Sequence, residues 1–359
     1  MPYRRTALLT LVSMLMPEAA EYPDYAPRDL GFGVVGFGKM GVLHSGVLNL
    51  LWRGCVRGVV DRSRLLVFGA SRLLNGVNFH RELKGMLRED DPDVVYVTTP
   101  AESHHGIVSR LIESGVRYIF VEKPPTTNSW ETNSLIDEMT RDQLVMVGFQ
   151  KRFTLPFRHA KMLISEEVIG EVERVSAYIR SSDILAPTSR FNGLGRGVLL
   201  DLGVHLLDLL LWIFDAGIVE ASKFRRIHTG VDDLFEARLR NEEGIVFDFE
   251  ASWSRPEYRL PETLITVKGS KGLLRATEDY LKVEATEGHP LLRDDRTLEM
   301  YRPHYYPGVP PVNLADPEYT LENMHFLHCI HTSSEPLTSL RNVAGTMELV
   351  DELYRAAGV

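Results

Sequence analysis

A glycine-rich string between an apolar strand and a helix is the feature that most constrains how this chain folds. Residues 31–35 are apolar, and residues 41–52 have the pattern of a helix. The residues that join them are Gly36, Phe37, Gly38, Lys39, Met40 and Gly41. In such a strand–turn–helix the first glycine permits a tight turn, the second lets the backbone approach a pyrophosphate, and the third allows close packing. The helix N-terminus adds N–H groups and a positive dipole. The string therefore predicts a dinucleotide site.

Apolar runs alternate with helical patterns as far as residue 150. Strands are expected at residues 56–60, 93–98, 118–121 and 144–147, and helices at 103–114 and 131–140. Near-continuous apolar strands separated by helices indicate a parallel sheet that is buried on both faces. The sequence thus predicts an α/β protein whose N-terminal domain, residues 30–150, is a Rossmann doubly wound parallel sheet.

The pattern changes after residue 150. Long strand-like runs, with turn signals between them, occupy residues 172–180, 234–240, 245–252 and 263–267, and a strongly apolar helix is expected at 199–214. Residues 287–317, rich in Pro, Tyr and His, are expected to form a long loop, followed by helices at 318–332 and 341–357. This alternation is typical of antiparallel hairpins. We therefore predict a C-terminal α+β domain at 151–338 with an open, mainly antiparallel sheet, and a C-terminal helix, residues 339–359, that packs back on the Rossmann domain.

Composition excludes several classes of protein. The net charge is −9, and no run of Lys and Arg occurs, which argues against a nucleic-acid partner. Two cysteines, Cys55 and Cys329, cannot build a disulfide framework and suggest a reduced, cytoplasmic protein. Residues 1–29 form an extension in which Arg4-Arg5 precedes an apolar run at 7–16, too short to span a bilayer. A twin-arginine export signal, a packed helix and an overlong start remain alternatives for it. No membrane partner is expected.

Asp61 ends the second predicted strand, 25 residues after Gly36. A carboxylate there can bind both ribose hydroxyls of NAD and would repel a 2′-phosphate. Arg62 and Arg64 follow it, and an arginine at this place can accept NADP instead. We expect NAD, with NADP as the alternative.

Two short motifs follow strands of the predicted parallel sheet at their carboxyl ends. Thr99-Pro100 follows the strand at 93–98, and Glu122-Lys123-Pro124 follows the strand at 118–121. Ligands of open α/β sheets bind outside these strand ends. The proline holds Lys123 in an extended conformation, so the lysine projects from the strand end. Near a nicotinamide it can polarise a carbonyl or stabilise an alkoxide.

The helix predicted at 199–214 carries an acid–base stripe. At about 100° per residue, Asp201, His205 and Asp208 share one face, while apolar residues cover the rest, so the stripe is expected to face an internal cleft. A histidine flanked by carboxylates can titrate near neutrality and act as general acid or base. The alternative is a hydrogen-bonded structural histidine, with Asp208 orienting it or capping a neighbour.

Two other groups of polar residues have weaker signals. Lys151 and Arg152 can bind an acidic substrate, or can form ion pairs within the chain. The histidines at 325, 328 and 331 lie near Cys329, but their spacing of three turns them around the helix axis, and no ligand pair completes a site. We therefore expect no metal.

Taken together, these residues resemble the glucose–fructose oxidoreductase / inositol dehydrogenase family (Gfo/Idh/MocA). The resemblance begins near Gly31 and rests on the glycine string at 36–41, Thr99-Pro100 with His104, the Glu-Lys-Pro string at 122–124, residues 148–153, the Asp-x-Gly-x-His-x-x-Asp string at 201–208, and residues 336–338. Ala101, where an asparagine is often found, and Arg196, within a common glycine run, depart from the family pattern.

The resemblance implies an open sheet that helps to form homodimers or homotetramers. It implies that Lys123, Asp201 and His205 are the catalytic group and line the substrate site, and that Pro100 and His104 lie near the cofactor. We also count Arg152 among the candidate substrate contacts and Glu122 among the candidate cofactor contacts. His205 would take a proton from a substrate hydroxyl while hydride leaves for nicotinamide. Lys123 would stabilise the oxyanion, and Asp201 would bind substrate or tune its neighbours.

Three functions are consistent with these residues. The first is an NAD(P)-dependent dehydrogenase or reductase acting on a secondary alcohol of a sugar, cyclitol or related polyol. The second keeps NAD tightly bound for a transient oxidation, as in glycoside cleavage or epimerisation. The third is a ligand-sensing regulator without catalysis. A sensor has no need of Lys123, Asp201 and His205 together, which favours an enzyme.

Overall fold

The computed structural model describes residues 30–51, 54–63, 67, 76–182, 196–258, 260–292, 296–302 and 317–358. Contacts divide them into two compact units, the first containing residues 30–150 and 317–342, the second residues 151–302 and 343–358. The N-terminal extension at 1–29, Arg64, and residues 303–316 of the predicted loop lie outside the described residues. Among the described helices, none is long and apolar enough to cross a membrane.

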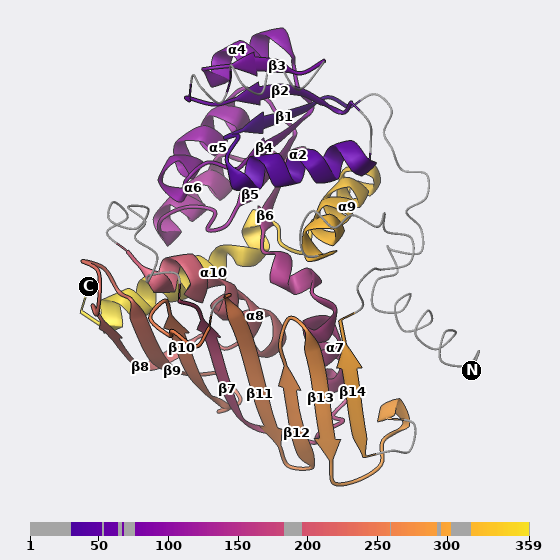
Figure 1. The fold of residues 1–359 in the computed structure, drawn as a ribbon, viewed down its shortest axis with the longest axis vertical. Helices are drawn as coiled ribbons and strands as arrows, with labels where there is room; N and C mark the ends of the chain where they lie inside the picture. Colours follow the sequence, from indigo (N-terminus) through magenta and orange to yellow (C-terminus); the bar gives the residue numbers. More distant parts are fainter. Residues whose placement is uncertain are drawn as a thin grey trace. The chain divides into compact units, whose positions relative to one another are not determined.

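A six-stranded sheet forms the centre of the first unit (Figure 1). Its strands are β1 (Phe32–Val35), β2 (Val56–Val60), β3 (Asn78–His80), β4 (Val94–Val97), β5 (Tyr118–Glu122) and β6 (Leu144–Gly148). They lie in the order β3-β2-β1-β4-β5-β6, and every pairing is parallel. β1 and β4 are buried at every position. The predicted Rossmann sheet is confirmed, and its strand order reverses between β1 and β4, where such sheets bind their ligands.

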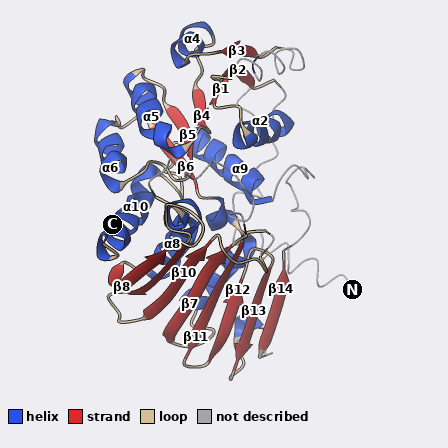
Figure 2. Ribbon diagram, turned by 60° about the vertical axis from the view of Figure 1, so that its left-hand side comes forward, coloured by secondary structure: helices blue, strands red, loops and turns tan. Residues whose placement is uncertain are grey.

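Helices cover both faces of this sheet. They are α2 (Lys39–Leu51), α4 (Leu83–Glu89), α5 (His104–Glu113), α6 (Ser129–Glu138) and α9 (Pro317–Thr332), with a 3₁₀ turn, η2 (Ala101–Ser103), before α5. α5 and α6 lie side by side on one face, and α2 and α9 on the other (Figure 2). α5 buries Val108, Leu111 and Ile112, which lie on one helix face. α9 groups with the first unit, although its sequence position suggested the second domain.

The second unit contains an eight-stranded, mainly antiparallel sheet, as the sequence predicted. Its strands are β7 (Val172–Arg180), β8 (Ile218–Arg225), β9 (Leu234–Arg240), β10 (Val246–Ser252), β11 (Glu262–Gly269), β12 (Gly272–Ala276), β13 (Tyr280–Ala285) and β14 (Thr297–Tyr301). The order is β14-β13-β12-β11-β7-β10-β9-β8, and β7 pairs with β10 in parallel. Alternate residues of β7, such as Val175, Ala177 and Ile179, are buried.

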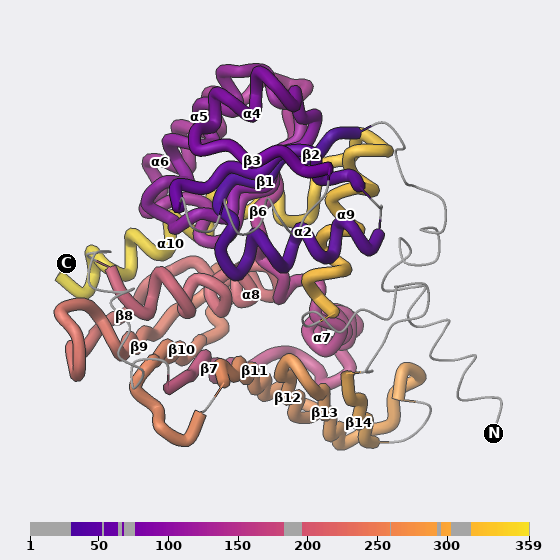
Figure 3. The backbone as a smooth tube through the Cα atoms, turned by 45° about the horizontal axis from the view of Figure 1, so that its top comes forward, coloured from indigo at the N-terminus to yellow at the C-terminus, as the bar shows by residue number. Residues whose placement is uncertain are grey.

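Helices lie on one face of this second sheet (Figure 3). They are α7 (Leu155–Ser165), α8 (Val204–Phe214) and, from Val343 onward, α10 (Leu340–Ala356). The opposite face carries cross-strand ion pairs, for example Asp248 with Arg174 and Arg238. The C-terminal residues 343–358 thus group with the second unit, whereas the sequence suggested that they pack on the Rossmann domain. The domain boundaries drawn from the sequence stay predictions.

Three sequence expectations need correction. The region expected to be a loop at 287–317 contains a 3₁₀ turn, η7 (Pro290–Leu292), and β14, which pairs with β13. The strands β8, β12 and β13 were not foreseen. The helix expected at 199–214 consists of a π-helical turn, η6 (Leu199–Gly203), followed by α8. A π turn winds more widely than an α-helix, so a rotation of 100° per residue does not hold through it.

His159 of α7 makes the stability of the second unit dependent on pH. Its side chain is 2% exposed, and burial lowers its pKa from an ordinary 6.5 to about 4, with Arg158 adding to this and the backbone at Leu155 opposing it. Between about pH 6.5 and pH 4, His159 is therefore protonated in the unfolded chain and neutral in the folded one. Stability is complete above pH 6.5 and falls as the pH drops toward 4, by up to about 3 kcal/mol.

We expect His159→Leu to lose less stability than the wild type between pH 7 and pH 4.5, measured by urea unfolding at each pH. His228→Gln, at an exposed histidine of the same unit, is the matched control and should follow the wild type. Equal losses in His159→Leu and the wild type would show that His159 is not the group responsible.

Candidate active site

Three glycines have different roles in the turn between β1 and α2: the backbone conformation requires Gly36 and Gly41, and Gly38 leaves open space beside the backbone. Gly36 has φ +94°, which side chains rarely adopt, and a Cβ on Gly41 would lie 2.0 Å from the carbonyl oxygen of Gly36. The Thr98 hydroxyl at the end of β4 donates to that same oxygen at 2.6 Å. A Cβ on Gly38, in contrast, would meet no described atom within 4 Å. The fold itself requires Gly36 and Gly41, whereas Gly38 leaves free space against the backbone, as a bound pyrophosphate needs.

Asp61 is fixed beside this turn by two backbone amides. Its Oδ2 accepts from the Phe37 N–H at 2.8 Å and its Oδ1 from the Ser63 N–H at 2.7 Å. The Phe37 ring packs edge-on against Phe79 at 5.9 Å, so its side chain belongs to the core. Lys39 and Arg62 are exposed, and Met40 is half-buried. The glycine turn and the carboxylate expected to bind ribose are thus directly hydrogen-bonded to each other.

His104, at the start of α5, ties two strand-end loops together. Its Nε2 lies 2.7 Å from the carbonyl oxygen of Thr99, and its Nδ1 lies 2.8 Å from that of Pro124. The ring is 1% exposed, and burial lowers its pKa, which the two carbonyls oppose. Sequence reasoning placed His104 near the cofactor. The structure shows in addition that the ring lies between the segment after Lys123 and the Thr99-Pro100 turn.

Behind Lys123 lies a buried histidine that sequence reasoning missed. His44 of α2 is fully buried, and its Nε2 lies 2.8 Å from Oε1 of Glu122, whose Oε2 accepts from the Lys123 N–H at 3.2 Å. The Asn323 amide of α9 donates to His44 Nδ1 at 3.0 Å. The Glu122 carboxylate is therefore held in place under the strand end that carries Lys123.

Another buried carboxyl group, that of Glu322 on α9, lies close to Glu122. Glu322 is fully buried, and neither of its carboxyl oxygens has a hydrogen-bond partner among the residues that the structure describes. Burial raises its pKa well above the ordinary value, and the neighbouring Glu122 and Glu318 raise it further. Burial and the two neighbouring carboxyl groups thus both favour the neutral form of Glu322.

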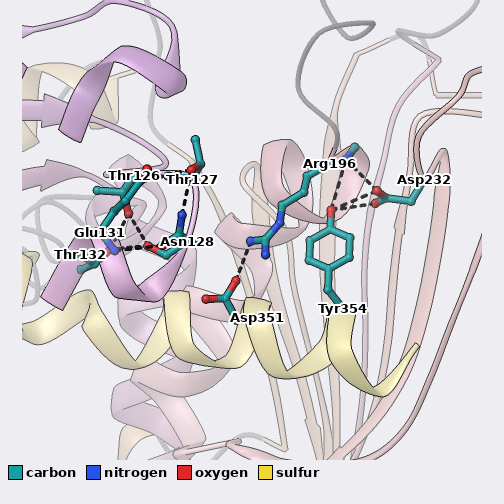
Figure 4. A network of polar contacts seen from close by, with 10 residues as sticks. Thr126, Thr127, Asn128, Glu131, Thr132, Arg196, Asp232, Asp351 and Tyr354 are labelled. Carbon is teal, nitrogen blue, oxygen red and sulfur yellow. Dashed lines mark hydrogen bonds and ion pairs between the residues drawn. The ribbon is translucent and has the colours of Figure 1, made fainter. Parts of the chain in front are cut away.

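The chain leaves Lys123 through a tightly hydrogen-bonded turn into α6 (Figure 4). Asn128 caps the helix, its Oδ1 accepting from the Glu131 N–H at 2.9 Å. Glu131 Oε2 in turn accepts from the Thr127 N–H at 2.9 Å, which makes a reciprocal capping arrangement. The hydroxyls of Thr126 and Thr132 lie 2.6 Å apart. The segment after Lys123 is consequently rigid.

The second unit carries Asp201 within the turn η6 and His205 at the start of α8. Asp201 is half-buried, and His205 is 4% exposed. Asp208, three residues after His205, is fully buried and accepts from Arg152 Nε at 2.7 Å and Nη2 at 2.6 Å, and from the Thr346 hydroxyl at 3.3 Å. Burial raises the pKa of Asp208, which Arg152 opposes. Asp208 is thus committed to a structural ion pair.

Lys151 and Arg152 both form ion pairs within the chain, which was one of the two alternatives for them. The Arg152 side chain is buried against Asp208, and Lys151 forms an ion pair with Glu278. Both cations have carboxylate partners within the second unit, and a contact of Arg152 with substrate stays a prediction. The described residues also contain no group of three His, Cys, Asp or Glu side chains that could hold a metal ion.

The predicted cofactor residues gather at the carboxyl ends of neighbouring parallel strands. Gly36 follows β1, Asp61 follows β2, Thr99 follows β4 and Lys123 follows β5. Because parallel strands end at one edge of their sheet, the first unit brings these side chains to the same edge. The second unit holds Asp201 and His205 on one rigid segment. The Lys123 ammonium thus belongs to the first unit, and the His205 imidazole and Asp201 carboxylate belong to the second. Groups of these kinds can transfer a proton or stabilise an oxyanion.

Comparison with known proteins identifies the family of this chain. Residues 30–149 match the model of an oxidoreductase family with an NAD-binding Rossmann fold, and residues 157–275 match the GFO/IDH/MocA C-terminal domain. The D-apiose dehydrogenase of Paraburkholderia graminis is 24% identical over 81% of this chain and 76% of its own. The scyllo-inositol 2-dehydrogenase (NAD(+)) of Bacillus subtilis is 23% identical over 85% of this chain and 87% of its own.

Solved structures share the whole fold. An oxidoreductase from Agrobacterium radiobacter, in complex with NAD+, L-tartaric acid and magnesium, superposes with a TM-score of 0.80 at 18% identity, covering 92% of this chain and 96% of that one. Levoglucosan dehydrogenase in complex with NADH and levoglucosan gives a TM-score of 0.78 at 20% identity, covering 91% and 97%. At such identities the likeness concerns the fold. With both family models matched in the expected order, this chain belongs to the Gfo/Idh/MocA family of NAD-binding oxidoreductases.

Proposed function

We propose that this oxidoreductase transfers hydride between NAD and a secondary alcohol of a sugar, cyclitol or related polyol. The observation that carries the proposal is the placement of Lys123 at the end of β5, fixed by His104 and by the Glu122–His44 pair beside the glycine turn. A lysine so placed can face a substrate oxygen next to a nicotinamide ring. The relatives support the substrate class, because their names refer to dehydrogenases of apiose and of inositols.

The residues that would hold NAD fit its parts. The open space at Gly38 and the N-terminus of α2 suit the pyrophosphate, and Asp61 suits the adenosine ribose. Thr99, Pro100 and Glu122 follow or end strands next to the switch in strand order, where the nicotinamide half would lie. When bound, NAD accepts the hydride that leaves the substrate carbon.

Three side chains of this chain would move or stabilise the remaining charges. As the alcohol carbon loses its hydride and becomes a carbonyl, His205 takes the hydroxyl proton on a ring nitrogen. The Lys123 ammonium stabilises the negative charge that develops on the substrate oxygen. Asp201 binds a neighbouring hydroxyl or tunes His205 and Lys123. The reverse reaction uses the same groups, with His205 returning the proton.

Assembly and location complete the proposal. A homo-oligomer that uses the outer face of the eight-stranded sheet fits the polar, ion-paired side chains there. A cytoplasmic location fits two cysteines that are both free and buried.

The glycine turn gives a matched pair of variants for the cofactor site. Gly38→Ala adds a methyl group in open space, so the protein should fold as the wild type does while its affinity for NAD falls by about tenfold or more. Gly41→Ala places the same methyl group 2.0 Å from the Gly36 carbonyl, so this variant should lose thermal stability even without cofactor. NAD titration by calorimetry and thermal melting of both variants measure this. If Gly38→Ala bound NAD as tightly as the wild type, NAD would not lie over this turn.

Activity itself is tested by following NADH formation with a panel of polyols, sugars and cyclitols. We expect turnover by the wild type and a fall in kcat of at least about 100-fold in Lys123→Met and in His205→Asn, with NAD affinity retained. His228→Asn, at an exposed histidine, should keep full activity. Bound NAD with no net NADH on any substrate would contradict a dehydrogenase and favour transient oxidation. Function that survives both substitutions would indicate a sensor.

A further inference from the structure

Asp232 accepts hydrogen bonds from three successive backbone amides at the start of the segment that carries Asp201 and His205. Gly197 N–H donates to Asp232 Oδ1 at 2.7 Å and Leu199 N–H to Oδ2 at 2.9 Å, while Val198 N–H donates to the Asp232 carbonyl oxygen at 2.8 Å. The first N–H groups of a helix have no partner within the helix. Asp232, between β8 and β9, supplies partners for three of them in succession.

The three hydrogen bonds from residues 197–199 to Asp232, called the Asp232 anchor below, differ from an ordinary helix cap. An ordinary cap is a side chain immediately before the helix, bonded two or three residues ahead. Asp232 lies 33 residues after Leu199 in the chain and is 4% exposed. Burial raises its pKa, which the amide hydrogen bonds oppose. The start of η6 is therefore tied to the loop between β8 and β9.

The C-terminal helix α10 holds the anchor from the other side. The Tyr354 hydroxyl, 2% exposed, lies 3.0 Å from Asp232 Oδ1 and 3.2 Å from Oδ2, and also 3.2 Å from the Gly197 nitrogen (Figure 4). Arg196 lies 4.8 Å over the Tyr354 ring and forms an ion pair with Asp351 at 2.6 Å. Arg196, which departs from the family pattern, thus ties the residue before Gly197 to two residues of α10.

The packing leaves the segment little freedom to slide or rotate. A Cβ on Gly197 would lie 2.2 Å from the Asp232 carbonyl oxygen, so the backbone approach at this end requires glycine. At the other end of η6, a Cβ on Gly203 would lie 3.2 Å from Ala251 Cβ and from the Phe249 ring. Asp201 lies between these two close approaches, and His205 follows the second by two residues.

We propose that Asp232 and Tyr354 are positioning residues of the active site, which fix the register of the turn that presents Asp201 and His205. The proposal rests on the function proposed above. Neither residue needs to touch substrate or cofactor. They act by keeping the amides of residues 197–199 in one position, because an ångström of misplacement of an acid–base group costs much of its catalytic effect.

Tyr354→Phe is the decisive variant, since it removes one hydroxyl and keeps the ring beneath Arg196. We expect kcat to fall about tenfold, with KM and NAD affinity within about twofold of the wild type, because binding is retained while the base is misplaced. Backbone amide exchange in residues 197–205, followed by mass spectrometry, should become about tenfold faster. Asp232→Asn should show larger effects of the same kind. If Asp232→Asn does not fold, Tyr354→Phe suffices.

The matched control is Tyr178→Phe in the same unit, which loses a phenol–carboxylate hydrogen bond of 2.7 Å to Glu262 on the outer face of the sheet. It should change neither kcat nor exchange at 197–205. Unchanged exchange in Tyr354→Phe, or faster exchange with unchanged kcat, would overturn the positioning role. A wild type that binds NAD but oxidises no polyol would overturn only the proposed function, since the exchange measurement still tests the anchor.

Discussion

The close approach of Gly41 to the carbonyl oxygen of Gly36 is the contact on which the first unit depends. Because Gly41 has no side chain, α2 can pass this close to Gly36 and begin three residues after it. The N-terminus of α2 then points to the place where the strand order reverses. Thr98 binds the same carbonyl and so joins the end of β4 to the turn. The position of α2 also decides where His44 lies, and through His44 the position of Glu122 beneath Lys123. One glycine contact therefore arranges both the cofactor turn and the lysine.

One buried polar residue in each unit holds backbone groups together. His104 joins two loops through their carbonyl oxygens, and Asp232 gathers three amides. Such groups are costly to bury unless every polar atom finds a partner, so they are kept where a fixed geometry matters. In this chain that place is the backbone on either side of Lys123 and the backbone before Asp201.

The sequence predicts well those features that depend on local periodicity. Strands 56–60, 172–180 and 234–240 have the predicted bounds, because each is a run of apolar or alternating residues between clear turns. β14 was expected to be a loop because its alternation is weak and the surrounding residues are rich in Pro and Tyr; its pairing with β13 supplies what its own sequence lacks. The π turn was missed because a sequence pattern assumes a constant rotation per residue.

The parts of the site that sequence did not reveal depend on contacts between distant residues. His44 and Asn323 are 279 residues apart, and Asp232 meets Tyr354 across 122 residues. A histidine inside a helix after a glycine turn, or a tyrosine near the chain end, carries no local sign of such a partner. The glycine string, Asp61 and Lys123 were identifiable because their roles follow from their place at a strand end, which the chain order alone indicates.

Two carboxylates on one helical segment illustrate how environment, and not residue type, assigns a role. Asp208 is fully buried, and its charge is matched by Arg152, so it fixes α8 to the neighbouring structure. Asp201, seven residues earlier, is half-buried and lies beyond that pair, within a turn whose start is held by Asp232. His205 lies between the two fixed points, the amides of residues 197–199 on one side and the Arg152–Asp208 pair on the other. Because the segment is held at both ends, the backbone that carries His205 is kept in one place by contacts several residues away from it on either side.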